Sequence, residues 1–379
     1  MIYLDNAATT KPSKNVIEAF LKSCDEYWAN PSSLHKFGEE VFFELKNSRD
    51  NIKKLLNIKN GEIFFTSSAT ESINLFFKGF LKKGDHIIIS DYEHAAVYES
   101  ARNFENEGGE VTYIKSENGT INPELVINEI KDNTKLVAVM FVNNEIGAIN
   151  PIKEICKQVK MKNSKIKLFV DGVQAVGKLK VDIDDLGCDA FVISPHKFHG
   201  LKGTGILYVK DDNIKPQILG GGQEQGLRSG TENVGGIFAS EVAIRDAVNN
   251  LDENIVKFKL LKERFLNNMS GFKGFKVNSP LNSVNNILNI SFERVKAEVL
   301  VHMLEEYEIY VNTSSACSKN GHKKSRTLTS IGLNDSEMKG ALRISFSDYN
   351  TVEEIDIATE KIKECVDRLR LILWENVYH

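Results

Sequence analysis

The sequence lacks any long hydrophobic run and any excess of positive charge. Its apolar runs are short, such as residues 136–142, whereas a membrane-spanning helix needs about 18 or more apolar residues in succession. The net charge of −4 comes from mixed acidic and basic residues, which argues against nucleic acid as the main ligand but leaves a local basic patch open. The first five residues contain no basic segment followed by an apolar one, so we expect no secretory signal and a soluble protein.

Cysteine is also scarce. The five cysteines are odd in number and irregularly spaced, which argues against a disulfide framework and predicts a reducing, cytoplasmic location. Cys317 differs from the other four, because the residues before it (313–316) are small and polar and those after it (319–324) are rich in lysine. Such a segment is typical of an exposed loop in which cations favour the thiolate. The sequence therefore indicates either a reactive thiol or an ordinary exposed cysteine at this position.

A length of 379 residues predicts about two domains. From about residue 60 to residue 245, short apolar runs alternate with segments of helical periodicity, which is typical of a mostly parallel, doubly wound α/β sheet. The predicted strands of this sheet are residues 62–66, 86–90, 111–114, 136–142, 167–170, 190–194 and 205–209.

The pattern changes after Leu251, where a long polar helix over about residues 252–268 begins a second region. Strands are expected at 286–292, 310–313 and 341–346, with helices at 297–307 and from Val352 toward the end of the chain. This mixture predicts a smaller α+β domain. We expect residues 14–251 to form the larger domain, and residues 1–13 and 252–379 to form the smaller one.

One lysine and one aspartate follow predicted buried strands. Lys197 comes just after the run 190–193, and Asp171 ends the run 166–170. A buried amine loses hydration, which lowers its pKa and makes it able to bond to a carbonyl cofactor, although Lys197 could also be one surface lysine among many. Pyridoxal phosphate needs a lysine for its aldehyde and a carboxylate that keeps its ring nitrogen protonated. The pair therefore predicts a pyridoxal phosphate site at one edge of the sheet.

Two further segments lie where the same edge is expected. Thr70 stands at the start of a predicted helix after the strand 62–66, where backbone amides could bind a phosphate, although a simple helix cap is the commoner role. His94 follows the strand 86–90 and could stack on a pyridine ring and move protons, although a lone loop histidine is more often structural.

Other motifs exclude alternative sites. His196 and His199 have no carboxylate or thiol at ligand spacing, so we expect no metal site. The glycine-rich loop 220–226 lacks the spacing of a dinucleotide fingerprint. Arg343 stands in an alternating strand on the face opposite Leu342 and Ile344, where its planar guanidinium could hold a substrate carboxylate or simply be solvated.

Taken together, these segments resemble the cysteine desulfurases, pyridoxal phosphate enzymes of the class V aminotransferase group. The resemblance spans nearly the whole chain and implies the aspartate aminotransferase-like fold (fold type I), with a mainly parallel seven-stranded sheet in the large domain. The matching stretches are residues 3–10, 30–35, 69–72, 93–94, 142–147, 170–174, 196–197, 228–233 and 315–317, together with Arg343.

The resemblance implies a role for each of several residues in a homodimer. Lys197 is expected to carry the cofactor, Asp171 to pair with the ring nitrogen, Gln174 to touch the ring hydroxyl, His94 to stack on the ring, and Ala69, Thr70, Ser194 and His196 to hold the phosphate. Thr231 is expected to reach the phosphate from the other subunit. Asn144 and Arg343 are expected to bind the substrate carboxylate, with Asn30 close by.

The implied reaction removes sulfur from L-cysteine. Lys197 takes the Cα proton, the Cys317 thiolate attacks the substrate sulfur, and L-alanine leaves while a persulfide remains on Cys317. His94 or Lys197 supplies protons. The persulfide sulfur then passes to an acceptor protein, such as an iron–sulfur scaffold or a tRNA-thiolation protein, and the sequence does not distinguish these acceptors or show whether a cluster contacts Cys317.

Two segments depart from the family pattern. Residues 321–325 replace an acidic residue and proline before the serine, which leaves the acceptor open, and residues 345–349 replace a commoner glycine–arginine sequence near Arg343. Three alternatives stay open: a selenocysteine lyase, an aminotransferase that needs no thiol, and a non-catalytic adaptor that keeps the fold.

Overall fold

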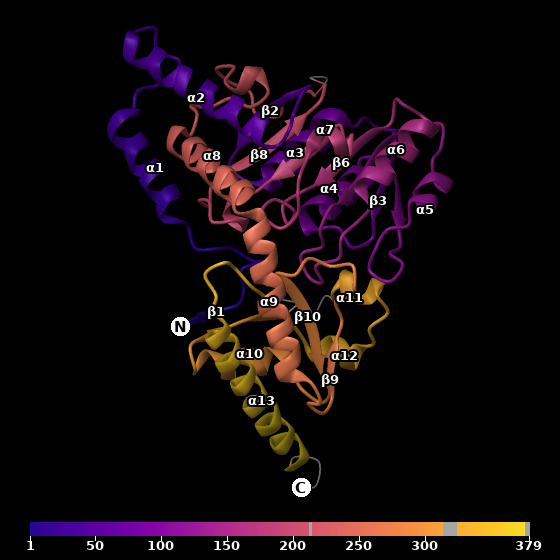
Figure 1. Ribbon diagram of the computed structural model, residues 1–379. Helices are drawn as coiled ribbons and strands as arrows, with labels where there is room; N and C mark the ends of the chain where they lie inside the picture. Colours follow the sequence, from indigo (N-terminus) through magenta and orange to yellow (C-terminus); the bar gives the residue numbers. More distant parts are fainter. Residues whose placement is uncertain (212–213, 314–323, 376–379) are drawn as a thin grey trace.

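The computed structural model describes residues 1–211, 214–313 and 324–375, and Figure 1 shows a larger part built on one sheet and a smaller part that contains both chain ends. The strand order of the large sheet is β2-β8-β7-β6-β5-β3-β4. Its strands are β2 (Glu62–Thr66), β3 (His86–Ser90), β4 (Glu110–Ile114), β5 (Thr134–Met140), β6 (Lys167–Asp171), β7 (Ala190–Ile193) and β8 (Gly205–Val209).

The predicted seven-stranded, mainly parallel sheet is confirmed, with one exception in direction. Strands β7, β6, β5, β3 and β4 run parallel to one another, whereas β8 runs antiparallel to both β2 and β7. An apolar run predicts a buried strand but carries no information on strand direction. The reversal of β8 was therefore outside what the sequence pattern could indicate.

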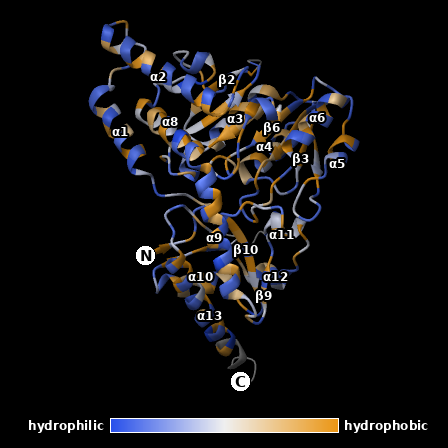
Figure 2. Ribbon diagram, in the orientation of Figure 1, coloured by the Kyte–Doolittle hydropathy of each residue, from blue (hydrophilic) through white to orange (hydrophobic). Residues whose placement is uncertain are grey.

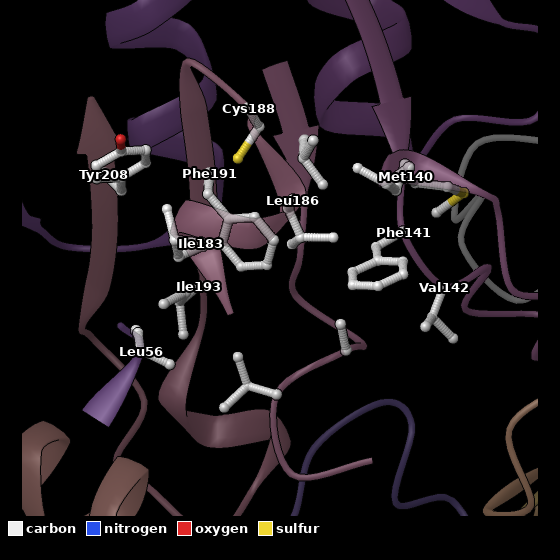
Figure 3. Packing of buried hydrophobic residues seen from close by; sticks show 14 of the residues in the cluster. Leu56, Met140, Phe141, Val142, Ile183, Leu186, Cys188, Phe191, Ile193 and Tyr208 are labelled. Carbon is white, nitrogen blue, oxygen red and sulfur yellow. The ribbon is translucent and has the colours of Figure 1, made fainter. Parts of the chain in front are cut away.

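Apart from the edge strand β4, which is largely half-exposed, the strands of the large sheet are buried on both faces, because their side chains alternate between two helical layers. On β7, Phe191 and Ile193 pack toward one layer, whereas Ala190 and Val192 pack toward the other. Figure 3 shows Phe191 and Ile193 beside Ile183 of α7. The first layer contains α1 (Lys14–Glu26), α2 (Lys36–Leu55), α5 (Pro123–Asn128), α6 (Ile152–Lys162), α7 (Ile183–Leu186) and α8 (Val234–Asn249), and the second contains α3 (Ala69–Phe80) and α4 (Ala95–Asn106). Figure 2 accordingly shows hydrophobic strands between helices of mixed character.

The smaller part is built on the antiparallel sheet β12-β13-β10-β9 and a short parallel pair, β1-β11. Its strands are β1 (Ile2–Tyr3), β9 (Phe275–Val277), β10 (Ile287–Phe292), β11 (Ile309–Tyr310), β12 (Asn312–Thr313) and β13 (Ala341–Ser345), and its helices are α9 (Leu251–Met269), α10 (Ala297–Glu305), α11 (Arg326–Ser330), α12 (Asp335–Lys339) and α13 (Val352–Glu375). Ile2 and Leu4 pack in the same core as α9, α10 and α13. This packing supports the division at residues 13 and 251, which stays a prediction.

Two features of the fold position the site. The parallel strands β3, β5, β6 and β7 all end at the same edge of the large sheet, because parallel neighbours share their direction. The N-terminal segment crosses this edge: Thr10 N donates to His196 O at 2.9 Å, and Ser13 N donates to His199 O at 3.0 Å. Within the part of the chain that the structure describes, no helix combines the length and apolar character needed to cross a membrane.

Candidate active site

A cavity of about 310 Å³ lies at this edge, between the large sheet and residues of the smaller part. Its wall gathers most of the residues that the sequence singled out from segments far apart in the chain. These are Ala69, Thr70, His94, Asn144, Asp171, Gln174, Ser194, His196, Lys197 and Arg343. The structure therefore brings ten predicted site residues to one cavity.

Lys197 ends η1 (Pro195–Lys197), a 3-10 helix of one turn that begins two residues after the end of β7. Its Nζ donates to the carbonyl oxygens of Ala7 at 2.9 Å and Ala8 at 2.7 Å. These carbonyls belong to the N-terminal segment that crosses the sheet edge, so the segment fixes where the amine lies. The alternative, that Lys197 is one surface lysine among many, is wrong, because the residue is half-buried in the cavity wall.

Asp171 ends β6, the strand next to β7, and is almost fully buried. Its Oδ1 accepts a hydrogen bond from the backbone N–H of Val173 at 3.0 Å. Burial raises the pKa of Asp171, and the nearby His94 and Lys197 offset part of that rise because cations favour the carboxylate. A cationic ring nitrogen in the cavity would act in the same direction as these two groups.

His94 caps the start of α4, where its Nδ1 accepts from the backbone N–H of Ala96 at 3.1 Å. This bond leaves Nε2 as the protonated nitrogen of the neutral ring. Partial desolvation at the cavity wall lowers the pKa of His94, although the residue keeps an exposed surface and Asp171 acts in the opposite direction. A neutral ring that lines the cavity is suited to stacking on a flat ligand and to moving a proton through Nε2.

The start of α3 forms the polar end of the cavity. Ser68 is the N-cap, and its side chain accepts from the backbone N–H of Glu71 at 3.1 Å. Ala69 and Thr70 begin the helix, where unpaired amides favour an anion. Burial lowers the pKa of His196 to about 4, and Lys197 adds to this effect, so His196 is neutral near pH 7 and can act as a hydrogen-bond partner without charge.

Arg343 reaches the cavity from β13 of the smaller part and is buried, so the alternative of a solvated arginine is wrong. Its Nη2 contacts Asp5 Oδ1 at 2.7 Å, and its Nη1 donates to the carbonyl oxygen of Asn144 at 3.0 Å. Its Nε is buried without a hydrogen-bond partner among the described residues. Asp5 and Asn144 therefore orient a guanidinium that keeps an unused donor.

The unusual segment 345–349 does not displace Arg343. Phe346 is buried in the smaller core, and Asp348 Oδ1 pairs with His199 Nε2 at 2.7 Å. The charged group in this segment is thus committed to a histidine on the far side of the Lys197 turn. Arg343 keeps its contacts with Asp5 and Asn144.

The residues of the cavity fit pyridoxal phosphate. Gln174 donates through Nε2 to Ala7 O at 2.9 Å, while its Oε1 is buried without a partner in the described part of the chain. An acceptor of this kind suits the hydroxyl of a pyridine ring. Together with an amine, a buried carboxylate and a helix start for a phosphate, this donor set matches the cofactor group by group.

Sequence reasoning assigned no role to Asp5, Glu93 and Glu145, although all three lie in stretches that carry the resemblance. Glu93, next to His94 in the sequence, is buried, and Glu145 accepts from Ser325 Oγ at 2.6 Å and from Thr327 Oγ1 at 2.9 Å. Their roles depend on contacts between distant segments. Their presence in matching motifs was the one available signal.

Three predicted residues are not placed at the cavity of this chain. Asn30 is exposed, and its Oδ1 accepts from Ser32 N at 2.9 Å; Thr231 is exposed in the loop before α8. Neither residue lines the cavity. Cys317 lies outside the described residues, and so does most of the atypical segment 321–325.

The chain is similar to one protein family, to named proteins and to solved structures. Residues 2–357 match the family model described as aminotransferase class-V. The chain is 38% identical over 387 residues to a protein named cysteine desulfurase IscS from Clostridium botulinum strain Hall, which covers 99% of this chain and 97% of that protein. A solved NifS-like protein superposes with a TM-score of 0.90 at 36% identity, covering 97% of this chain and 99% of the other. A structure titled SspA in complex with cysteine gives a TM-score of 0.80 at 31% identity, with 93% and 100% covered.

Proposed function

Because the chain belongs to the class V aminotransferase family, we propose that it is a cysteine desulfurase that depends on pyridoxal 5′-phosphate. It converts L-cysteine into L-alanine and leaves the sulfur as a persulfide on Cys317. The observation that carries this proposal is the cavity in which Lys197, Asp171, His94 and Arg343 meet. Near full-length relatives named for this activity support the choice among pyridoxal phosphate reactions.

Each cavity residue has a task in holding the cofactor. When bound, the cofactor supplies a ring that withdraws electrons from the Cα of an attached amino acid. Lys197 would hold its aldehyde, Asp171 would keep its ring nitrogen protonated, Gln174 would bond its ring hydroxyl and His94 would contact its ring. Ala69, Thr70, Ser194 and His196 would bind its phosphate.

The substrate is oriented by the arginine from the smaller part. Arg343 binds the carboxylate of L-cysteine together with Asn144, with Asn30 nearby, and its unused Nε–H supports this role. Lys197 Nζ then removes the proton from the substrate Cα, and His94 Nε2 or Lys197 Nζ returns protons to the product. Lys197 therefore has two tasks in this proposal: it holds the cofactor and it moves protons.

Sulfur leaves the substrate by attack of the Cys317 thiolate. A new S–S bond forms between Cys317 Sγ and the substrate sulfur while the substrate Cβ–S bond breaks, and the three-carbon product takes up protons and leaves as alanine. Thr313 lines the cavity, and Cys317 follows it by four positions in the sequence, a separation of at most about 14 Å along an extended chain. This sequence spacing supports Cys317 as the attacking thiol.

The quaternary state and the partners extend this proposal. We propose a homodimer in which Thr231 reaches the phosphate site of the partner subunit, and an acceptor protein that takes the persulfide sulfur for iron–sulfur cluster assembly or tRNA thiolation. The exposed aromatic residues Trp28, Phe42 and Phe43 support a dimer contact near α2. The four described cysteines are free thiols, which supports a reducing, cytoplasmic location.

Replacing Cys317 with serine tests the reaction. Cys317→Ser should lower sulfide release from L-cysteine by about 100-fold or more, because no thiolate attacks the substrate sulfur, while the visible absorption of bound cofactor is retained. Cys24→Ser, which removes an exposed thiol elsewhere, is the matched control and should behave as the unaltered protein. Full cysteine turnover by Cys317→Ser would contradict the proposal and favour a thiol-independent aminotransferase or a selenocysteine lyase. A protein that gains no visible absorption with pyridoxal phosphate would favour the adaptor.

A further inference from the structure

We propose that Lys178 is a positioning residue for Lys197, which it holds from the side opposite to the candidate active site. The inference rests on the proposed function, in which Lys197 bonds to the cofactor. Lys178 Nζ donates to the backbone carbonyl oxygen of Lys197 at 2.7 Å. At its other end, Lys197 Nζ is bonded to the carbonyls of Ala7 and Ala8. Lys197 is therefore anchored through both its main chain and its side chain.

Lys178 reaches this position from the same loop that carries the cofactor-facing carboxylate. The loop runs from Asp171 at the end of β6 through Gln174 to Lys178, and Lys178 N donates to Ala175 O at 3.0 Å. One tight loop thus presents Asp171 and Gln174 to the cavity and Lys178 to the turn after β7. A shift of the loop would move all three groups together, which couples the position of the amine to that of the ring-nitrogen partner.

A second cavity, of about 430 Å³, lies behind the Lys197 turn. Lys197 lines both cavities, so its turn forms part of the wall between them. The second cavity is lined by Lys178, His199, Asp246 and Asp348, among other residues. A turn with open space behind it lacks dense packing on that side, and the hydrogen bond from Lys178 supplies the support that packing would otherwise give.

The charge balance around Lys178 argues against a purely structural ion pair. Lys178 is only 7% exposed, and no described carboxylate forms an ion pair with it. The two acids of the second cavity are committed elsewhere: Asp246 Oδ2 accepts from Asn15 Nδ2 at 3.0 Å, and Asp348 pairs with His199 at 2.7 Å. Burial lowers the pKa of Lys178 to about 7, and the neighbouring Lys197 adds to this effect. A buried amine in contact with the backbone of the cofactor lysine, without a counter-ion, is explained by its bond to that backbone.

The test compares three variants of the full-length protein. Lys178→Met removes the donor at nearly constant volume, Lys178→Gln keeps a neutral donor, and Lys180→Met removes an exposed lysine two residues away as the matched control. The measurements are the dissociation constant of pyridoxal phosphate, from absorbance titration, and the visible circular dichroism of the bound cofactor, which reports how the cofactor is held.

We expect Lys178→Met to weaken cofactor binding about tenfold, since a lost hydrogen bond to a buried carbonyl is of that size, and to change the visible circular dichroism. Lys178→Gln should recover affinity to within about threefold, and Lys180→Met should match the unaltered protein. Unaltered binding and circular dichroism in Lys178→Met would overturn the inference, as would a Lys178→Gln variant that folds but binds as weakly as Lys178→Met. If Lys178→Met does not fold, Lys178→Ala takes its place, with the same expected result and the same contradicting result. If the unaltered protein itself binds no pyridoxal phosphate, the proposed function has failed rather than this inference.

Discussion

Burial sets the protonation state of individual residues at this site, and Glu93 is the clearest example. Glu93 is 2% exposed, its Oε1 accepts from Ser90 Oγ at 2.5 Å and from Met140 N at 2.8 Å, and its Oε2 has no partner in the described chain. Burial raises the pKa of Glu93 to about 8, and the nearby Asp171 adds to the rise. Near pH 7 the folded protein therefore holds a neutral acid next to His94 in the sequence, which avoids a second negative charge beside Asp171.

This raised pKa predicts how Glu93 affects stability. Between about pH 4.5 and pH 8 the folded protein keeps the Glu93 proton while the unfolded chain loses it, so the residue's contribution falls as pH rises, by at most about 1.4 kcal/mol per pH unit. Glu93→Gln cannot ionise and should gain melting temperature relative to the unaltered protein as pH increases from 5 to 8. The exposed control Glu107→Gln should show no such trend. A difference in melting temperature between Glu93→Gln and the unaltered protein that stays constant from pH 5 to pH 8 would contradict the assignment.

At the residue scale, the sequence indicated those groups whose role follows from their place at a strand end. Lys197, Asp171 and His94 each follow a run of apolar residues, and the sheet brings those ends together. Asp5 could not be recognised because its partner, Arg343, lies 338 residues away in the sequence. Lys178 could not be recognised because its partner is a backbone carbonyl, that of Lys197. A contact of either kind leaves no mark in local sequence.

At the scale of elements, strand positions were predictable because the central strands are buried on both faces and read as continuous apolar runs. Predictions were wrong where the path of the chain changes within an apolar run. The strand expected at 310–313 is two short strands, β11 paired with β1 and β12 paired with β13. The run 136–142 also extends past β5, which ends at Met140: Phe141 still donates to Asp171 O, but Val142 turns to form an isolated bridge with Ile149.

The contact between β8 and the start of α3 yields a prediction at this scale. A Cβ at Gly205 would lie 2.6 Å from Ser68 O and 2.4 Å from Ser68 C. Gly205→Ala should therefore push the start of α3 away, lower the free energy of unfolding by about 1–3 kcal/mol, and weaken cofactor binding at the phosphate end. Melting temperature and cofactor titration measure both effects, and Lys210→Ala, at an exposed position just past the opposite end of β8, is the control. Cofactor affinity unchanged in a destabilised Gly205→Ala protein would separate α3 from the phosphate site.

At the scale of the whole molecule, the isolated chain leaves apolar residues exposed between the end of α1 and the first half of α2. Trp28 is 70% exposed and Leu34 103%, while Phe42 and Phe43 of α2 are each about half exposed. Clustered exposed aromatic residues are typical of a protein interface. The sequence could not separate these residues from a buried helix face, because helical spacing looks the same whether the partner is the same chain or another.

Introducing negative charge on this surface tests the homodimer. The double variant Phe42→Asp with Phe43→Asp should sediment as a monomer and bind pyridoxal phosphate about tenfold more weakly, because Thr231 of the partner subunit no longer contributes a hydrogen bond to the phosphate. Met161→Asp, which alters an exposed apolar residue on α6, should leave both properties unchanged. Sedimentation velocity and absorbance titration provide the readouts. A double variant that remains dimeric would exclude this surface, and an unaltered protein that is monomeric would exclude the dimer.

The central claim is that one amine, that of Lys197, bonds to the cofactor in the cavity beside Asp171. The most direct measurement treats the cofactor-loaded protein with sodium borohydride, which makes the bond permanent, and maps the added mass by digestion and peptide mass analysis. The account predicts a single pyridoxyl phosphate group on Lys197. A group on any other lysine, including the neighbouring Lys178, or no group at all on a protein saturated with pyridoxal phosphate, would contradict it.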